Sequence, residues 1–146
     1  MTLFILDTDH VSLLMEGNAT IRHRKQQEAG EVITTIVTVQ EVFNGWLSRI
    51  NAKENTQNPV PLYGKLWTTT EYFKDITIAN YNNAAHATYQ QMLKQNPPLR
   101  KNRLQRDMRI AAISLSLGAT LVTRNRRDFE LVPGLPIDDW SKPLNN

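Results

Sequence analysis

Short apolar runs alternate along this chain with longer segments in which apolar residues recur every three or four positions. A short apolar run between polar residues predicts a buried strand, and helical spacing predicts an amphipathic helix. The runs predict strands at 3–6, 32–35, 76–78, 120–123 and 135–137. The spacing and the breaker residues predict helices at 11–15, at 20–30, from 38 onward, at 62–73, at 82–93, and before Gly118.

Strands that alternate with helices predict a parallel sheet with helices on both faces, which is an α/β fold. Neither a break in composition nor a repeat divides the 146 residues, so we expect a single domain over 1–146. The segment 51–61 is rich in Asn and Pro and is expected to be a loop.

Acidic and amide side chains recur at the boundaries of these elements. Asp7 directly follows the first apolar run, and Asp9 comes two residues later. Later boundaries carry Glu41, Asp107, Asn125 and Asp128. In open α/β sheets, ligands bind outside the carboxyl ends of the strands. A buried charge there is costly unless it is compensated, so Asp7 indicates a cation or a role in handling phosphate.

Several of these positions also have a purely structural interpretation. Thr8 or Asp9 can cap a helix that begins at His10. The segment 38–41 fits a capping box, in which the acid at 41 bonds the amide at 38. The segment 125–128 fits an N-cap followed by an acid that suits the helix dipole. Capping and function remain open alternatives at these positions.

Asp107 resists a capping role better than the other acids. Its helical neighbours Ile110 and Ala111 place its carboxylate beside an apolar face, while Arg106 and Arg109 diverge from it. A carboxylate beside a core face requires a partner. That partner is either an arginine from elsewhere in the chain or a hydrated metal ion.

Carboxylates that converge on one crevice repel one another unless a divalent cation holds them. Mg²⁺ takes oxygen ligands and keeps several of its waters, so one or two protein carboxylates suffice. Such an ion can lower the pKa of a water and stabilise the leaving oxygen of a phosphodiester displacement. The histidines at 10, 23 and 86 show no ligand spacing and do not lie among the acids, so we expect surface or packing roles for them.

Composition narrows the possible classes of protein. The chain has no cysteine, which excludes disulfides, thiolate metal sites and a cysteine nucleophile. The apolar start is too short for a signal peptide or a membrane span, so we expect a soluble, cytoplasmic protein. A formal charge of +3 and a pI near 9.3 suit a polyanionic partner.

These motifs, in this order, resemble the PIN domain and, within it, the VapC-type toxins of prokaryotic toxin–antitoxin pairs. The matching segments are 6–9, 38–41, Asp107 with 110–112, 121–125 with 128–129, and the tail 132–140. The resemblance covers nearly the whole chain; the segment 46–75 has no motif to anchor it. It implies a three-layer α/β/α sandwich around a parallel sheet and a metal-dependent endoribonuclease, with loops of transfer or ribosomal RNA as the usual targets.

The resemblance also implies residue roles and partners. It assigns catalysis and the binding of Mg²⁺ or Mn²⁺ to Asp7, Glu41, Asp107 and Asp128. It assigns supporting roles to Asp9, Thr123 and Asn125. A homodimer is expected, and so is a VapB-type antitoxin whose C-terminal segment fills the crevice.

Positive residues flank two of these acids in the sequence. We expect RNA contacts from Arg100, Lys101, Arg103, Arg106, Arg124, Arg126 and Arg127, although such charge runs also form solvated helix faces. For the run 22–25 we expect a solvated face. Trp46 and Trp67 are expected in the core or in an interface rather than as platforms for base stacking.

Two other functions fit parts of this pattern. Haloacid-dehalogenase-type phosphatases also begin with Asp-x-Asp after a strand, but they usually carry Thr where this chain has Val11. Their late acidic pair would have to be 138–139, very near the C-terminus. A non-catalytic PIN-like RNA-binding module is the better alternative, and the retained set of acids favours an enzyme over it.

Overall fold

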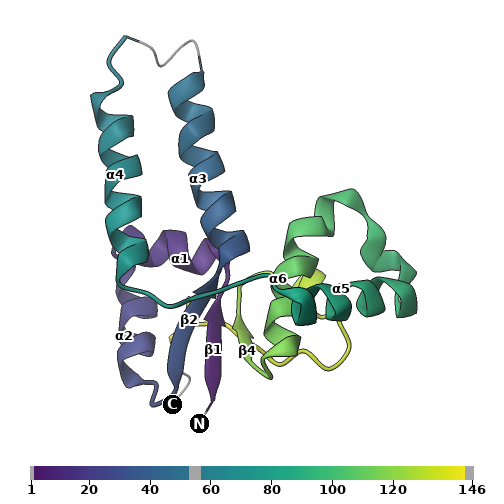
Figure 1. Cartoon of the computed structure of the whole chain (residues 1–146). Helices are drawn as coiled ribbons and strands as arrows, with labels where there is room; N and C mark the ends of the chain where they lie inside the picture. The colour runs from purple at the N-terminus through teal and green to yellow at the C-terminus, as the bar shows by residue number, and fades with distance from the viewer. Residues whose placement is uncertain (1, 53–56, 144–146) are drawn as a thin grey trace.

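A computed structural model describes residues 2–52 and 57–143, and its centre is a parallel β-sheet (Figure 1). Within those residues the strand order is β3-β2-β1-β4-β5. The strands are β1 (Leu3–Leu6), β2 (Glu31–Thr35), β3 (Ile78–Ala79), β4 (Thr120–Val122) and β5 (Ile137–Asp138). The central strand β1 pairs with β2 and β4, so the first apolar run of the chain lies in the middle of the sheet.

Helices cover both faces of the sheet, which confirms the expected α/β/α sandwich. One face carries α1 (Thr8–Met15), α2 (Ala19–Gln27), α3 (Ile36–Asn51) and α4 (Val60–Lys74). The other carries α5 (Asn83–Gln95), α6 (Gln105–Ser116) and the short α7 (Arg126–Phe129). Two short 3₁₀ turns, Pro97–Arg100 and Asn102–Leu104, connect α5 to α6.

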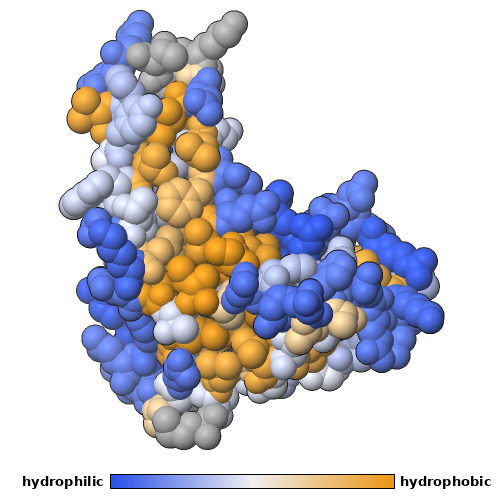
Figure 2. Space-filling model, in the orientation of Figure 1, coloured by the Kyte–Doolittle hydropathy of each residue, from blue (hydrophilic) through white to orange (hydrophobic). Residues whose placement is uncertain are grey.

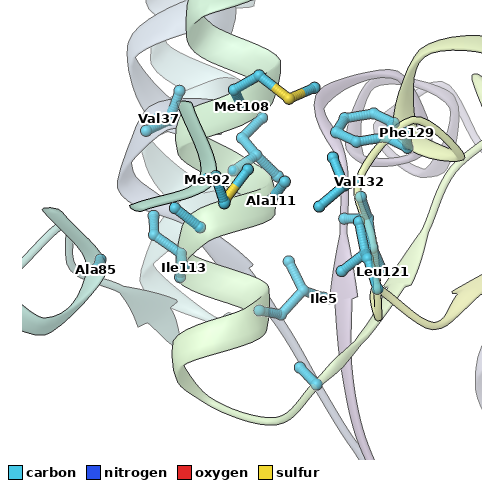
Figure 3. Packing of buried hydrophobic residues seen from close by; sticks show 14 of the residues in the cluster. Ile5, Val37, Ala85, Met92, Met108, Ala111, Ile113, Leu121, Phe129 and Val132 are labelled. Carbon is cyan, nitrogen blue, oxygen red and sulfur yellow. The ribbon is translucent and has the colours of Figure 1, made fainter. Parts of the chain in front are cut away.

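The alternation of side chains along β1 separates two apolar clusters. Ile5 points to the cluster beneath α5 and α6, where Leu121 of β4 joins it (Figure 3). Phe4 and Leu6 point to the opposite cluster, together with Val122. Because β1 is buried on both faces, its sequence is a continuous apolar run rather than an alternating one.

The predicted elements are present, with shifted boundaries at several ends. α1 begins at Thr8 rather than 11, and α3 begins at Ile36 rather than 38. The third strand lies at Ile78–Ala79 and the last at Ile137–Asp138, in place of 76–78 and 135–137. These two strands lie at the edges of the sheet, where few apolar residues mark a register. Residues 53–56 of the expected loop lie outside the described residues.

The α3–α4 pair extends beyond the sheet and carries apolar side chains on its surface (Figures 1 and 2). Large exposed apolar side chains on the pair are Ile36, Leu47, Val60, Tyr63 and Trp67. Trp67 is 66% exposed, so it is not a core residue. Trp46 is half-buried, and the guanidinium of Arg49 lies 5.0 Å from its ring centroid. In the described part of the chain, every helix is too short or too polar to cross a membrane.

Candidate active site

Asp7 lies immediately after β1 and is 6% exposed. Its amide donates to the carbonyl of Val122 on β4 at 3.1 Å, which extends the sheet by one bond. Its Oδ1 accepts the amide N–H of His10 at 2.8 Å, so Asp7 is itself the N-cap of α1. Our expectation that Thr8 or Asp9 caps a helix beginning at His10 is therefore wrong. Helix α1 begins at Thr8, two residues earlier than that expectation required, so the carboxylate of Asp7 reaches the free amides.

Glu41 lies on α3 and points towards the same edge of the sheet. The cap of α3 is Thr35, whose Oγ1 accepts the amide N–H of Thr38 at 3.1 Å, so the capping box at 38–41 is not formed. Glu41 instead accepts the Thr8 hydroxyl on Oε1 at 2.7 Å and Arg106 Nε on Oε2 at 3.2 Å. Helix α3 starts one turn too early for Glu41 to act as a capping acid.

Asp107 is half-buried on α6. No hydrogen bond or ion pair joins its carboxylate to another residue in the described part of the chain, so neither Arg106 nor a distant arginine neutralises it directly. The pKa of Asp107 is raised to about 6: burial is the largest cause, repulsion from Glu41, Asp128 and Asp7 adds to it, and Arg106 acts in the opposite direction. The structure thus brings all four predicted acids into one electrostatic group.

Asp128 stands on α7 at the far side of this group. The Asn125 amide donates to its Oδ2 at 3.1 Å, and Arg103 NH1 lies 3.2 Å from both carboxylate oxygens. The Asn125 hydrogen bond, followed by Arg103, lowers the pKa of Asp128. Asn125 also caps α7, because its Oδ1 accepts the backbone N–H of Asp128 at 3.3 Å. The hydroxyl oxygen of the buried Thr123 accepts the backbone N–H of Asn125 at 2.9 Å. Asn125 therefore both caps α7 and donates a hydrogen bond to the carboxylate of Asp128.

The donor set suits a hard divalent cation. Asp107 offers a carboxylate without a protein partner, and Asp7 Oδ2 accepts no hydrogen bond from the described residues. All the candidate ligands are oxygens, which Mg²⁺ and Mn²⁺ prefer. Across 2–52 and 57–143, no three acidic or imidazole groups approach closely enough to share one ion. Glu41 and Asp128 are drawn towards Arg106 and Arg103 instead.

Comparison with known proteins finds chains of similar sequence and fold. The chain is 29% identical to the tRNA(fMet)-specific endonuclease VapC of Shigella flexneri, over 97% of this chain and 100% of the relative. A chain in the VapBC-1 structure from nontypeable Haemophilus influenzae superposes with a TM-score of 0.77 at 21% identity, covering 97% of this chain and 100% of that one. For VapBC2 of Rickettsia felis bound to a promoter DNA fragment, the TM-score is 0.72 at 16% identity, covering 95% and 99%.

This chain has the PIN-domain fold of VapC proteins. The resemblance expected from the sequence is thereby confirmed, over almost the full length of both chains. No protein-family model matches the chain.

Three of the predicted RNA-binding arginines pair with acids that are predicted site residues. Arg103 pairs with Asp128, Arg106 with Glu41, and Arg124 Nε with Asp9 at 2.5 Å. These arginines are about half exposed, so each pair contributes little to stability. Of the others, Arg100 bonds the carbonyl of Leu93 and Arg126 lies 3.6 Å from Glu130, while Lys101 and Arg127 are exposed.

A groove of about 380 Å³ opens beside Glu41, between α1, α3 and α4. Thr8 and Glu41 form the end nearest the acids, and Trp46, Arg49 and Lys65 line the side towards the α3–α4 pair. The VapC-like site therefore continues into a cleft that has an apolar wall and cationic side chains.

Sequence reasoning missed His10 and Arg24 of this VapC-like fold. His10 is fully buried and its Nδ1 lies 3.2 Å from Asp7 Oδ1, so a histidine does lie among the acids, whereas His23 and His86 are exposed as expected. Arg24, expected on a solvated face, is 7% exposed and lies 3.2 Å from Asp138. The three-residue spacing between Asp7 and His10 was the available signal for the first contact.

The Asn125 contact leads to a prediction that separates its two roles. Replacing Asn125 by Ser keeps an oxygen that can cap α7 but removes the amide donor to Asp128. We expect the pKa of Asp128 to rise, measured by carboxylate NMR titration. A carboxylate whose pKa is lower in the folded state than in the unfolded chain stabilises the fold at pH values above the unfolded pKa of 3.8. The Ser variant loses part of this stabilisation, so it should be slightly less stable than wild type at pH 7.

The pH series supplies the control for this prediction. The difference from wild type should disappear as the pH falls through the pKa of Asp128, where the carboxylate is protonated in both proteins. Asn125→Ala should show the same rise in the pKa and an additional loss of about 1 kcal/mol from the missing cap at every pH. An unchanged pKa of Asp128 in both variants would contradict the assigned contact.

Proposed function

We propose that this protein is a metal-dependent endoribonuclease and the toxin of a toxin–antitoxin pair. The observation that carries the proposal is Asp107, a half-buried carboxylate without a protein partner whose pKa is raised to about 6 among three other acids. A divalent cation would relieve that repulsion. The similarity to a VapC named as a tRNA(fMet)-specific endonuclease supports RNA as the substrate, with loops of transfer or ribosomal RNA as the targets.

In this proposal, Asp7, Glu41, Asp107 and Asp128 hold Mg²⁺ or Mn²⁺. When bound, the ion supplies a Lewis acid that activates water and neutralises charge developing on the scissile phosphate. The Thr8 hydroxyl orients Glu41, and the Asn125 amide orients Asp128. Asp7 Oδ2 and the Asp107 carboxylate accept no hydrogen bond from the described residues, so both could bind the ion without breaking a contact within the protein.

The arginines at the rim act on the RNA backbone. Arg106 pairs with Glu41 and Arg103 with Asp128, and both arginines are exposed enough to turn towards phosphates. Arg124 stands on the other side, beside Asp9. Phosphate contacts by these side chains would make RNA binding weaken as salt rises.

Protein partners are part of the same proposal. Structural neighbours of this chain are VapB–VapC complexes, and we propose a VapB-type antitoxin for this protein as well. The exposed apolar residues of α3 and α4 supply surface for contacts in a homodimer (Figure 2). We further propose that the chain forms one PIN-like domain. We also propose that it acts in the cytoplasm, where cellular RNA is available.

The test is incubation of the purified protein with total RNA in Mg²⁺ or Mn²⁺. We expect cleavage with either ion, no cleavage in EDTA, and none by Asp7→Asn. Asparagine is a good N-cap, so the variant should keep α1 and the stability of the fold. RNA that is bound but never cut would favour the non-catalytic binding module. Cleavage that persists in EDTA or in Asp7→Asn would indicate a contaminating nuclease and contradict the proposal.

A further inference from the structure

His10 connects the C-terminal segment to the end of β1. Its ring is fully buried, with Nδ1 at 3.2 Å from Asp7 Oδ1 and Nε2 at 3.2 Å from the backbone nitrogen of Trp140. The two contacts use both ring nitrogens. They join parts of the chain that are 130 residues apart in sequence.

The contact with Trp140 determines the tautomer of His10. A backbone N–H can only donate, so Nε2 must keep its lone pair and the ring proton must lie on Nδ1. Nδ1–H then donates to Asp7.

The segment that presents the Trp140 amide is itself held in place. Asp138 Oδ2 accepts Arg24 NH2 at 3.2 Å and Trp140 Nε1 at 3.1 Å. Asp139 Oδ1 lies 3.6 Å from His10 Nε2, but it accepts the amide and the hydroxyl of Ser141 at 2.8 and 2.6 Å. The nearest carboxylate is therefore engaged elsewhere, and the Trp140 amide is the partner of Nε2.

Both hydrogen bonds from His10 end on one oxygen of Asp7. Oδ1 accepts the backbone N–H and the ring Nδ1–H of His10, while Oδ2 accepts none from the described residues. An oxygen with two donors is poorly able to bind a cation as well. The carboxylate is thus fixed in rotation, with Oδ2 as its available ligand atom.

We propose that His10 is a positioning residue: the Trp140 amide sets its tautomer so that Nδ1–H fixes Asp7 and leaves Oδ2 for the cation. This inference rests on the proposed metal-dependent function. Residues that orient a metal ligand in this way typically change metal affinity by about 10–100-fold when they are removed.

The tautomer can be measured in the wild-type fold without a metal. In a His23→Gln/His86→Gln variant, His10 is the only histidine left. We expect its ring ¹⁵N NMR signals to show a protonated Nδ1 and an unprotonated Nε2 in EDTA. The opposite tautomer would overturn the inference and leave the proposed nuclease function standing.

Three substitutions of His10 test its action on metal binding. Asn places an amide N–H near the position of Nδ1 and keeps the donor to Asp7; Gln reaches the position of Nε2, and Leu supplies neither group. Measured by Mn²⁺ titration calorimetry, His10→Asn should bind within about threefold of wild type. His10→Gln and His10→Leu should bind about 10–100-fold more weakly.

The outcomes of these experiments separate the positioning role of His10 from the proposed nuclease function. In RNA cleavage at saturating Mn²⁺, the losses in Gln and Leu should fall on kcat rather than on KM for RNA, since His10 does not face the substrate. Mn²⁺ affinity equal to wild type in folded Gln and Leu variants would overturn the positioning role alone. A wild-type protein that binds no Mn²⁺ would contradict the proposed function, and with it this inference. Should the variants not fold, the tautomer measurement decides.

Discussion

Asp107→Asn is expected to lower RNA cleavage by about 10²–10³-fold or more and, at the same time, to stabilise the fold. The substitution keeps the shape of the side chain but removes its charge. At pH 8 without divalent cations, the free energy of unfolding should increase by about 1–3 kcal/mol, because the charged carboxylate is partly buried and is repelled by three neighbouring acids. A residue that destabilises the fold while it supports activity is characteristic of a functional site.

The pH dependence gives this prediction its sign. The folded-state pKa of Asp107 is raised from 3.8 to about 6, so the folded protein binds the proton more tightly than the unfolded chain. Wild-type stability therefore falls as the pH rises from about 4 to 6, relative to the Asn variant. Below pH 4 the carboxyl is neutral in both states, and the advantage of the variant should disappear. Urea denaturation in EDTA across this range measures the effect.

A cation should reverse the order of stability. Mn²⁺ binds only the folded site, so it should raise the stability of wild type more than that of Asp107→Asn. Asp75→Asn is the matched control, because Asp75 is exposed and remote from the acids; it should change neither cleavage nor the response to Mn²⁺. If Asp107→Asn cleaves RNA as wild type does, or is less stable than wild type at pH 8, the assignment of Asp107 is wrong.

Trp140→Ala should have the largest effect on stability. The side chain is fully buried, its ring centroid lies 5.1 Å from that of Phe4, and its Nε1 donates to Asp138. Truncation leaves a cavity against β1 and removes one of the two hydrogen bonds to Asp138 Oδ2, and we expect a loss of about 3–5 kcal/mol in the free energy of unfolding. The backbone N–H that contacts His10 remains, so a folded variant should retain the His10 tautomer.

Trp67→Ala is the control for that substitution. It removes the same atoms from a site that is 66% exposed, so it should change the stability of the monomer by about 0.5 kcal/mol or less. Urea denaturation of both variants at one protein concentration makes the comparison. Equal losses in the two variants would show that the C-terminal segment does not pack against β1 as described.

The sequence predicted the layers and the acids because both depend on local patterns. Buried parallel strands are apolar runs whatever their neighbours are, and Leu3–Leu6 and Thr120–Val122 were identified on that basis. The acids at 7, 41, 107 and 128 follow such runs or begin helices, and strand polarity places those positions at one edge of the sheet.

Capping was the point at which local reasoning failed. Glu41 fitted the acid of a capping box, and the cap of the first helix was expected at Thr8 or Asp9 rather than at Asp7. A change of two residues in the start of a helix reverses both assignments, as Thr35 and Asp7 show. Sequence patterns locate helix ends only to within a few residues, so they cannot decide which carboxylate is left for chemistry.

By itself, the sequence determined the α/β order and the burial of the first strand, and it predicted a group of acids near the strand ends. Only the tertiary structure decided which partner each acid has: Arg106 for Glu41, Arg103 for Asp128, and none for Asp107 in the described residues. It alone revealed the contact between His10 and Trp140. The physical reason is the separation in sequence of the residues involved. Burial and helical spacing depend on neighbouring residues, whereas hydrogen bonds between distant segments depend on how the whole chain packs.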